Sequence, residues 1–175
     1  MSAATPEVLV AQAQALERAG RLPEAIGLYE RALAQRPDLT DTWYNLGRLR
    51  RFAGRYEAAL AAYDEALARG VALPEEVRLN RAVIYVDCLH RPDDAERELR
   101  AALALNPDYL PALLNLGNLH EDRGRRDAAR DCYERILSRD PLHVDALARL
   151  AGVSSVKSPD AALAVRLREA LARPD

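Results

Sequence analysis

Apolar residues recur at helical spacing along the chain, in short segments that end at glycine or proline. Residues 40–73 show the pattern most clearly, with one apolar face before Gly54 and a second face after it. The two faces together comprise Trp43, Leu46, Gly47, Leu49, Ala59, Tyr63 and Ala66. Because glycine favours helix ends, this segment is predicted to form two short helices joined by a turn. The small residues Gly47 and Ala59 would let the two helix axes approach closely.

The same pattern returns with a period of about 34 residues. A later copy reproduces the key positions as Gly117, Gly124, Ala129 and Tyr133. The residues before Pro37 end a first copy in the same way, and a fifth copy follows from Val144. The predicted repeats are 6–39, 40–73, 76–109, 110–143 and 144–175, and each is expected to be a pair of helices.

The third repeat allows two starting points. A start at residue 75 aligns Asn80 with the asparagines of other repeats, but it places Arg78 and Arg81 in apolar columns. A start at residue 76 fills the same columns with Leu79, Ala82, Val83 and Val86. Because burying two unpaired arginines would cost several kcal/mol, the second start is favoured. Residues 74–75 are then predicted to be an insertion in the preceding turn.

The residues Trp43, Leu46 and Gly47, followed by Gly54, Ala59, Tyr63 and Ala66, resemble the tetratricopeptide repeat family. A single pair of helices cannot bury both of its faces, so neighbouring repeats must stack. The resemblance covers nearly the whole chain and implies an all-α, right-handed solenoid of about five helix–turn–helix repeats. It also implies a single domain over residues 1–175, in which the first helix of each pair lines a concave groove that usually holds a peptide or another protein.

By this resemblance, the residues that face a ligand lie in the columns of Asp41, Tyr44, Asn45, Arg48, Arg51 and Phe52. The predicted peptide-binding residues are Tyr44, Asn45, Arg48, Asn80, Arg81, Ile84, Asn115, Asn118 and Arg149. In one column, asparagine and arginine alternate, as Asn45, Arg81, Asn115 and Arg149. An asparagine amide suits a peptide backbone, and an arginine suits a carboxylate. These four side chains are expected to project toward one curved surface.

Two other interpretations of these columns stay open. Tetratricopeptide domains that bind the C-terminal carboxylate of a chaperone use Asn and Arg here, together with two lysines and a further Asn. In this chain the lysine positions hold Val10 and Val77, or Asn80 and Asp145, so such a clamp would at best be partial. Alternatively, the side chains form a solvated concave face or contacts within the solenoid.

Composition limits the kind of partner. The chain has 175 residues, a net charge of −2 and 30% charged residues, unlike a nucleic-acid-binding arm or an acidic tail. The basic run from Arg48 to Arg55 could attract phosphate, but no aromatic series accompanies it, and nucleic acid is not the predicted partner. No apolar run reaches the ~18 residues of a membrane span, and the N-terminus has no signal-peptide pattern. We therefore predict a cytoplasmic protein without a membrane partner.

No catalytic or cofactor-binding motif stands out. The sequence lacks the glycine-rich phosphate loops and the nucleophile motif of common enzyme families. His90, His120 and His143 share no metal-ligand spacing with Cys88 or Cys132, so no metal site is predicted. The two cysteines are interpreted as buried thiols of a reducing compartment. The chain is predicted to be a scaffold for protein binding, with no cofactor and no enzymatic activity of its own.

The C-terminal segment carries a second resemblance. Residues 143–175 are similar in pattern and composition to the segment that joins the repeats to the catalytic domain in bacterial repeat-containing sulfotransferases. This resemblance implies an alternative function, the docking or regulatory region of a larger enzyme.

The last helix is predicted at about 159–172. Its inward face is expected to contain Leu163, Leu167, Ala170 and Leu171. A second, small apolar stripe comprises Ala161, Val165 and Ala172. Because a terminal repeat normally carries a polar outer face, this stripe could meet a downstream domain or a second copy of the chain in a homo-oligomer. An alanine-rich surface that water tolerates is the alternative.

Overall fold

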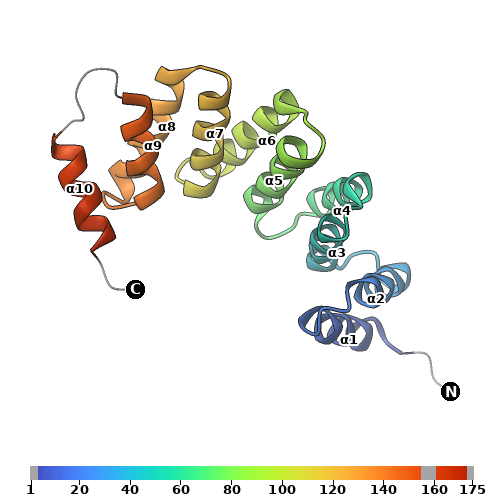
Figure 1. The fold of residues 1–175 in the computed structure, drawn as a ribbon. Helices are drawn as coiled ribbons and strands as arrows, with labels where there is room; N and C mark the ends of the chain where they lie inside the picture. Colours follow the sequence, from blue (N-terminus) through green and yellow to red (C-terminus); the bar gives the residue numbers. More distant parts are fainter. Residues whose placement is uncertain (1–3, 155–160, 173–175) are drawn as a thin grey trace. The chain divides into compact units, whose positions relative to one another are not determined.

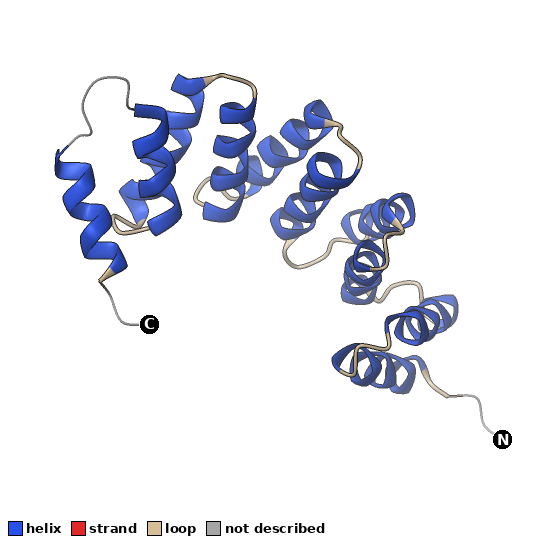
Figure 2. Cartoon of the chain, in the orientation of Figure 1, coloured by secondary structure: helices blue, strands red, loops and turns tan. Residues whose placement is uncertain are grey.

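A computed structural model describes residues 4–154 and 161–172 of the chain, and every regular element in these two ranges is a helix (Figure 2). Figure 1 labels the helices in chain order. Their bounds are α1 Pro6–Arg18, α2 Leu22–Gln35, α3 Thr40–Phe52, α4 Tyr56–Ala68, α5 Pro74–Val83, the π-helix η1 Ile84–Cys88, α6 Pro92–Leu105, α7 Leu110–Asp122, α8 Arg126–Arg139, α9 Val144–Ser154 and α10 Ala161–Leu171. The predicted all-α fold class is confirmed.

The chain forms two compact units, residues 1–91 and residues 92–175. In unit 1, α1 packs on α2, α3 packs on α2 and α4, and α5 packs on α4. In unit 2, α7 packs on α6 and α8, and α9 packs on α8 and α10. The predicted third repeat crosses the division, because α5 and η1 belong to unit 1 and α6 belongs to unit 2.

The helix starts follow the repeat pattern with one exception. Helices α1, α3, α7 and α9 begin at the first residues of the corresponding predicted repeats. Helix α5 instead begins at Pro74, so the predicted insertion at residues 74–75 is wrong. Proline is favoured in the first turn of a helix, where its missing N–H leaves no bond unmade. Because α5 begins earlier than predicted, this repeat is longer than the others. The additional residues lie after α5, where the π-helix η1 follows and His90 adopts a φ of 53°.

Glycine follows the first helix of three pairs, as Gly20, Gly54 and Gly124. The sequence predicted the last two as turn residues. Gly54 and Gly124 adopt φ values of 73° and 70°, a region that other residues enter only at a cost. The next residue then closes the turn, since the N–H of Arg55 and that of Arg125 each donate to a helix carbonyl over 2.8 Å.

Each of these two helix pairs is held by a close contact between a glycine and a tyrosine ring. Tyr63 and Tyr133 are fully buried. A Cβ atom added to Gly47 would lie 2.7 Å from Cδ1 of Tyr63, and one added to Gly117 would lie 2.5 Å from Cε1 of Tyr133. No real side chain tolerates such distances without movement of the ring. Glycine therefore sets the spacing of the two helices in each pair.

Substitution of Gly47 tests this contact. We expect Gly47→Ala to destabilise the chain by roughly 1–3 kcal/mol, because the added methyl group displaces the Tyr63 ring. The matched control is Gly27→Ala in α2, where an added Cβ meets nothing within 4 Å. The control should be neutral, or stabilising by up to about 1 kcal/mol through helix propensity. Urea unfolding followed by circular dichroism measures both variants, and equal effects would contradict the account.

A buried carboxylate connects helices in unit 2. Glu96 of α6 is 5% exposed and accepts hydrogen bonds from Arg123 Nη1 (2.9 Å) and Arg125 Nη2 (2.6 Å) at the α7–α8 turn. Arg100 of α6 itself lies 2.5 Å from the same carboxylate. The hydrogen bonds from Arg125 are the largest cause of a lowered pKa of Glu96. The network therefore ties α6 to α7 and α8 while its carboxylate is ionised.

Because the pKa of Glu96 is lowered by folding, its ion pairs stabilise the chain at neutral pH and lose this effect as the pH falls below the ordinary glutamate range of about 4. We expect Glu96→Gln to destabilise the chain by roughly 1–3 kcal/mol at pH 7, with a smaller difference from wild type at pH 3.5. Urea unfolding at the two pH values measures this. The exposed Glu57→Gln is the control, and a pH-independent loss for Glu96→Gln would contradict the assignment.

Candidate functional site

Helix α3 carries three of the predicted ligand-facing residues, and two of them connect it to neighbouring helices. The Tyr44 hydroxyl donates a hydrogen bond to Oε1 of Glu76 on α5 over 2.6 Å. Arg48 forms an ion pair with Glu17 on α1. Both α3 side chains are half-buried. Burial and the hydrogen bond to Glu76 raise the pKa of Tyr44, so its hydroxyl remains protonated at neutral pH.

Asn45 lies between these two residues in the sequence, but its side chain does not bond to a neighbouring helix as theirs do. Its side chain is half-buried, and in the described part of the chain its amide has no hydrogen-bond partner. By contrast, Asn80 on α5 donates from Nδ2 to the main-chain oxygen of Glu76 over 3.0 Å. Asn45 therefore offers one free donor and one free acceptor group, whereas the polar groups of Tyr44 and Arg48 on the same helix are already paired.

Arg81 does not project from the surface, and the prediction that it would is wrong. Its side chain is only 9% exposed and forms an ion pair with Asp64 on α4. Counted from the observed start of α5, Arg81 is the eighth helical residue, the place that Gly47 holds in α3 and Gly117 in α7. The prediction assumed that a buried arginine would lack a partner, whereas Asp64 supplies one.

Ile84 is also misplaced by the predicted alignment. It is fully buried and belongs to the core, so it cannot contact a ligand. In the observed alignment it is the eleventh residue from the start of α5, equivalent to His120 in α7, which is buried as well. Leu79, rather than Arg81, is the equivalent of Asn45.

In unit 2, the predicted residues are already bonded to their own chain. Asn115 donates from Nδ2 to the oxygen of Pro111 over 2.8 Å. Asn118 accepts a hydrogen bond from the Tyr133 hydroxyl over 2.9 Å. Arg149 is exposed and lies 3.7 Å from Oε2 of Glu121. These contacts match the alternative that such side chains stabilise the repeats.

Among the described residues, both units contain a chain of polar contacts that sequence reasoning missed. The Tyr29 hydroxyl lies 3.4 Å from Glu17, which pairs with Arg48 on the next first helix. In the same way, the Tyr133 hydroxyl donates to Glu121 over 3.0 Å, and Arg149 approaches that carboxylate from α9. The detectable signal was a glutamate at the twelfth residue of both α1 and α7.

The second repeat lacks this contact. Arg51 holds the twelfth place in α3, and the Tyr63 hydroxyl has no hydrogen-bond partner among the described residues. Burial raises the pKa of Tyr63 to about 12. A buried hydroxyl without a partner costs free energy, since its bonds to water are lost and not replaced.

Two tyrosine substitutions test whether the Tyr63 hydroxyl lacks a hydrogen-bond partner while the Tyr133 hydroxyl has one. Tyr63→Phe should leave stability unchanged or raise it by up to about 1 kcal/mol, because it removes an unpaired hydroxyl. Tyr133→Phe should cost roughly 1–2 kcal/mol, because it removes a hydrogen bond shared by Asn118 and Glu121. Thermal unfolding of the two variants provides the comparison. A larger loss for Tyr63→Phe than for Tyr133→Phe would be inconsistent with these contacts.

A cavity of about 240 Å³ opens beside Tyr44 in unit 1. Two of its walls are helices α3 and α5, and the third is the loop that precedes α5. Its lining residues are Asp41, Tyr44, Val71, Ala72, Leu73 and Glu76. The cavity therefore brings aromatic, acidic and apolar groups of α3, α5 and the loop before α5 together.

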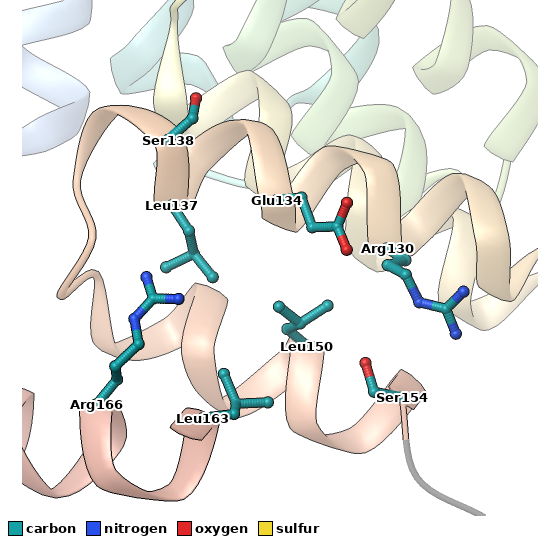
Figure 3. Close-up of a pocket in the computed structure, with 8 residues that line it drawn as sticks. All are labelled: Arg130, Glu134, Leu137, Ser138, Leu150, Ser154, Leu163 and Arg166. Carbon is teal, nitrogen blue, oxygen red and sulfur yellow. The ribbon is translucent and has the colours of Figure 1, made fainter. Parts of the chain in front are cut away.

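A second cavity, of about 400 Å³, lies in unit 2 between α8, α9 and α10 (Figure 3). Leu137, Leu150 and Leu163 point into its centre. The two arginines at its edge are already engaged, since Arg166 donates to the oxygen of Pro141 over 2.7 Å and Arg130 pairs with an aspartate. Glu134, which also lines this cavity, has no hydrogen-bond or ion-pair partner among the described residues.

Helix α10 follows the predicted pattern in part. Leu163 and Ala170 are buried and Val165 is exposed, as predicted. Leu171, the last residue of the helix, is 66% exposed, so its predicted inward position is wrong. Residues 159–160, the side chain of Ala161 and the predicted Ser–Pro–Asp helix start lie outside the described residues.

Two further observations concern the chain as a whole. No helix in the described ranges is both long and apolar enough to cross a membrane. Cys132 is buried and Cys88 half-buried, and both are free thiols.

Comparisons with known proteins agree with the fold. The tetratricopeptide repeat family matches residues 2–70 and again residues 89–152. The solved structure of MamA protein superposes with a TM-score of 0.78 at 20% identity, covering 95% of this chain and 90% of that one. The structure of YrrB, described as a TPR protein with an unusual peptide-binding site, has a TM-score of 0.69 at 21% identity, covering 93% of this chain and 83% of that one. At these identities the likeness concerns the fold alone.

Human Protein O-mannosyl-transferase TMTC2 is 29% identical over 110 residues. The match covers 62% of this chain but only 13% of that protein. With the repeated family match and the helix pairs described above, the chain belongs to the tetratricopeptide repeat family.

Proposed function

We propose that this protein is an interaction scaffold and that the α3 face of unit 1 binds a peptide segment of another protein. The free, half-buried amide of Asn45 is the observation that carries the proposal. A peptide backbone offers the alternating N–H and C=O groups that an asparagine amide can bond. Tyr44, which lines the cavity, directly precedes Asn45 in α3, and Arg48 follows Asn45 by about one helical turn.

The same reasoning favours unit 1 over unit 2. The amides of Asn115 and Asn118 are already hydrogen-bonded within the chain, so a ligand would have to replace those contacts. The peptide-binding site named in the description of YrrB belongs to that protein, and it supports only the general class of function.

The carboxylate clamp is a weaker candidate. It requires an arginine that is free to bind the C-terminal carboxylate of a ligand. Arg81 is buried against Asp64, and the exposed Arg149 lies 3.7 Å from Glu121 and lacks the two lysines that the clamp needs. The absence of enzymatic activity stays a prediction, since one relative is named as a transferase. A role as the docking region of a larger enzyme, a cytoplasmic location and a homo-oligomer through α10 also stay predictions.

Selection from a random 12-residue phage-displayed peptide library on the intact chain tests the proposal. We expect peptides to be enriched, and Asn45→Ala to weaken a selected peptide by about fivefold to tenfold in fluorescence anisotropy, because two hydrogen bonds are lost. Gln35→Ala, which removes an exposed amide at the end of α2, is the matched control and should not alter affinity. An empty selection, or equal binding by the Asn45→Ala variant, would contradict the proposed surface.

A further inference from the structure

The cavity beside Tyr44 is strongly acidic for its size. Two of its lining residues are the carboxylates of Asp41 on α3 and Glu76 on α5. Within the described ranges neither carboxylate has an ion-pair partner, and Glu76 accepts only the neutral hydroxyl of Tyr44. This contrasts with Glu17, which faces Arg48, and with Asp64, which faces Arg81.

The rest of the cavity wall is apolar. Of its lining residues, Val71 is buried and Leu73 is 54% exposed. The ring of Tyr44 completes the wall, with its centroid 6.0 Å from that of the buried Tyr63. A suitable occupant must therefore combine an apolar stem with a positive end group.

The equivalent places in other repeats do not share this chemistry. Counted from the helix starts, the places of Asp41, Tyr44 and Glu76 are taken by Pro111, Leu114 and Ala146 between α7 and α9. Between α1 and α3 they are taken by Glu7, Val10 and Thr42. Stacking of the helices thus does not require two carboxylates and a tyrosine here, and the set is specific to one position in the chain.

We propose that this cavity receives a lysine or arginine side chain of the bound peptide. The inference rests on the proposed function and adds the chemical class of the ligand. The aliphatic stem packs on Val71, Leu73 and the Tyr44 ring, as long basic side chains do when only their end groups carry charge. The ammonium or guanidinium group pairs with Asp41 and Glu76, which form charge-assisted hydrogen bonds.

A metal ion fits the cavity less well. Divalent cations such as Ca²⁺ take six or more oxygen ligands, whereas the described residues contain no group of three His, Cys, Asp or Glu side chains able to hold one. The remaining wall of the cavity is hydrocarbon, which suits an organic cation.

The experiment uses the peptides selected on the intact chain, synthesised with an acetylated N-terminus so that no terminal amine competes with the side chain. We expect one basic residue common to the selected peptides. Its replacement by norleucine, which keeps a linear stem but lacks the charge, should weaken binding about tenfold. The Asp41→Asn/Glu76→Gln double variant should weaken the basic peptide by a similar factor and leave the norleucine peptide nearly unaffected.

Two controls make the outcome specific. Glu57→Gln/Asp131→Asn removes the same charge from exposed positions on α4 and α8 and should not change binding of either peptide. Thermal unfolding of both double variants checks that the fold is retained. This inference would be overturned if the Asp41→Asn/Glu76→Gln variant lost equal affinity for the basic and norleucine peptides, or if the selected peptides shared no basic residue. In either case Asn45→Ala would still test the proposed function. If no peptide is selected, the proposed function fails and this inference fails with it.

Discussion

The contact between a small residue on the first helix and a large side chain on the second sets the geometry of the helix pairs. Gly47 against Tyr63 and Gly117 against Tyr133 leave no room for a Cβ atom. Overpacking at such a contact costs roughly 1–3 kcal/mol, a large share of the 5–15 kcal/mol that stabilise a typical domain. The tyrosine ring therefore lies against the first helix of its pair, and the partner of its buried hydroxyl differs from one repeat to the next.

The partner of the tyrosine hydroxyl depends on the twelfth residue of the first helix. Where the twelfth residue of the first helix is glutamate, it accepts from the tyrosine and pairs with an arginine of the next first helix. In the second repeat Arg51 holds this place, and the Tyr63 hydroxyl is left unpaired. The contact between the glycine and the tyrosine recurs in two repeats, while the polar residues around it differ. Each repeat can therefore expose different polar side chains, such as Asn45 and the carboxylates of the acidic cavity in unit 1.

The periodic apolar pattern was sufficient to predict the helix pairs, because the same spacing recurs with the same turn glycines. It failed in the third repeat, where Arg81 occupies a place that is glycine in α3 and α7. A pattern along one helix cannot show that Asp64, on another helix, neutralises a buried arginine. The wrong alignment then placed Ile84 on the surface, although it is fully buried.

The acidic cavity could not be predicted for a related reason. The hydroxyl of Tyr44 meets the carboxylate of Glu76, 32 residues later, only after α3 and α5 have come together around the loop at Val71 to Leu73. Periodicity in the sequence identifies Tyr44 and Asn45 as neighbours on one helix, but it carries no information on which side chains already have partners. The free amide and the unpaired carboxylates emerge only from the packed structure.

The central claim is that ligand binding uses the polar groups of unit 1 that the fold leaves unpaired. Amide chemical-shift mapping by NMR on the intact chain, titrated with a selected peptide, tests it most directly. The account predicts the largest shifts at Asn45, Leu73 and Glu76, with little change at Arg31 on α2 or Glu57 on α4. Shifts concentrated at those α2 and α4 positions, or confined to unit 2, would contradict it.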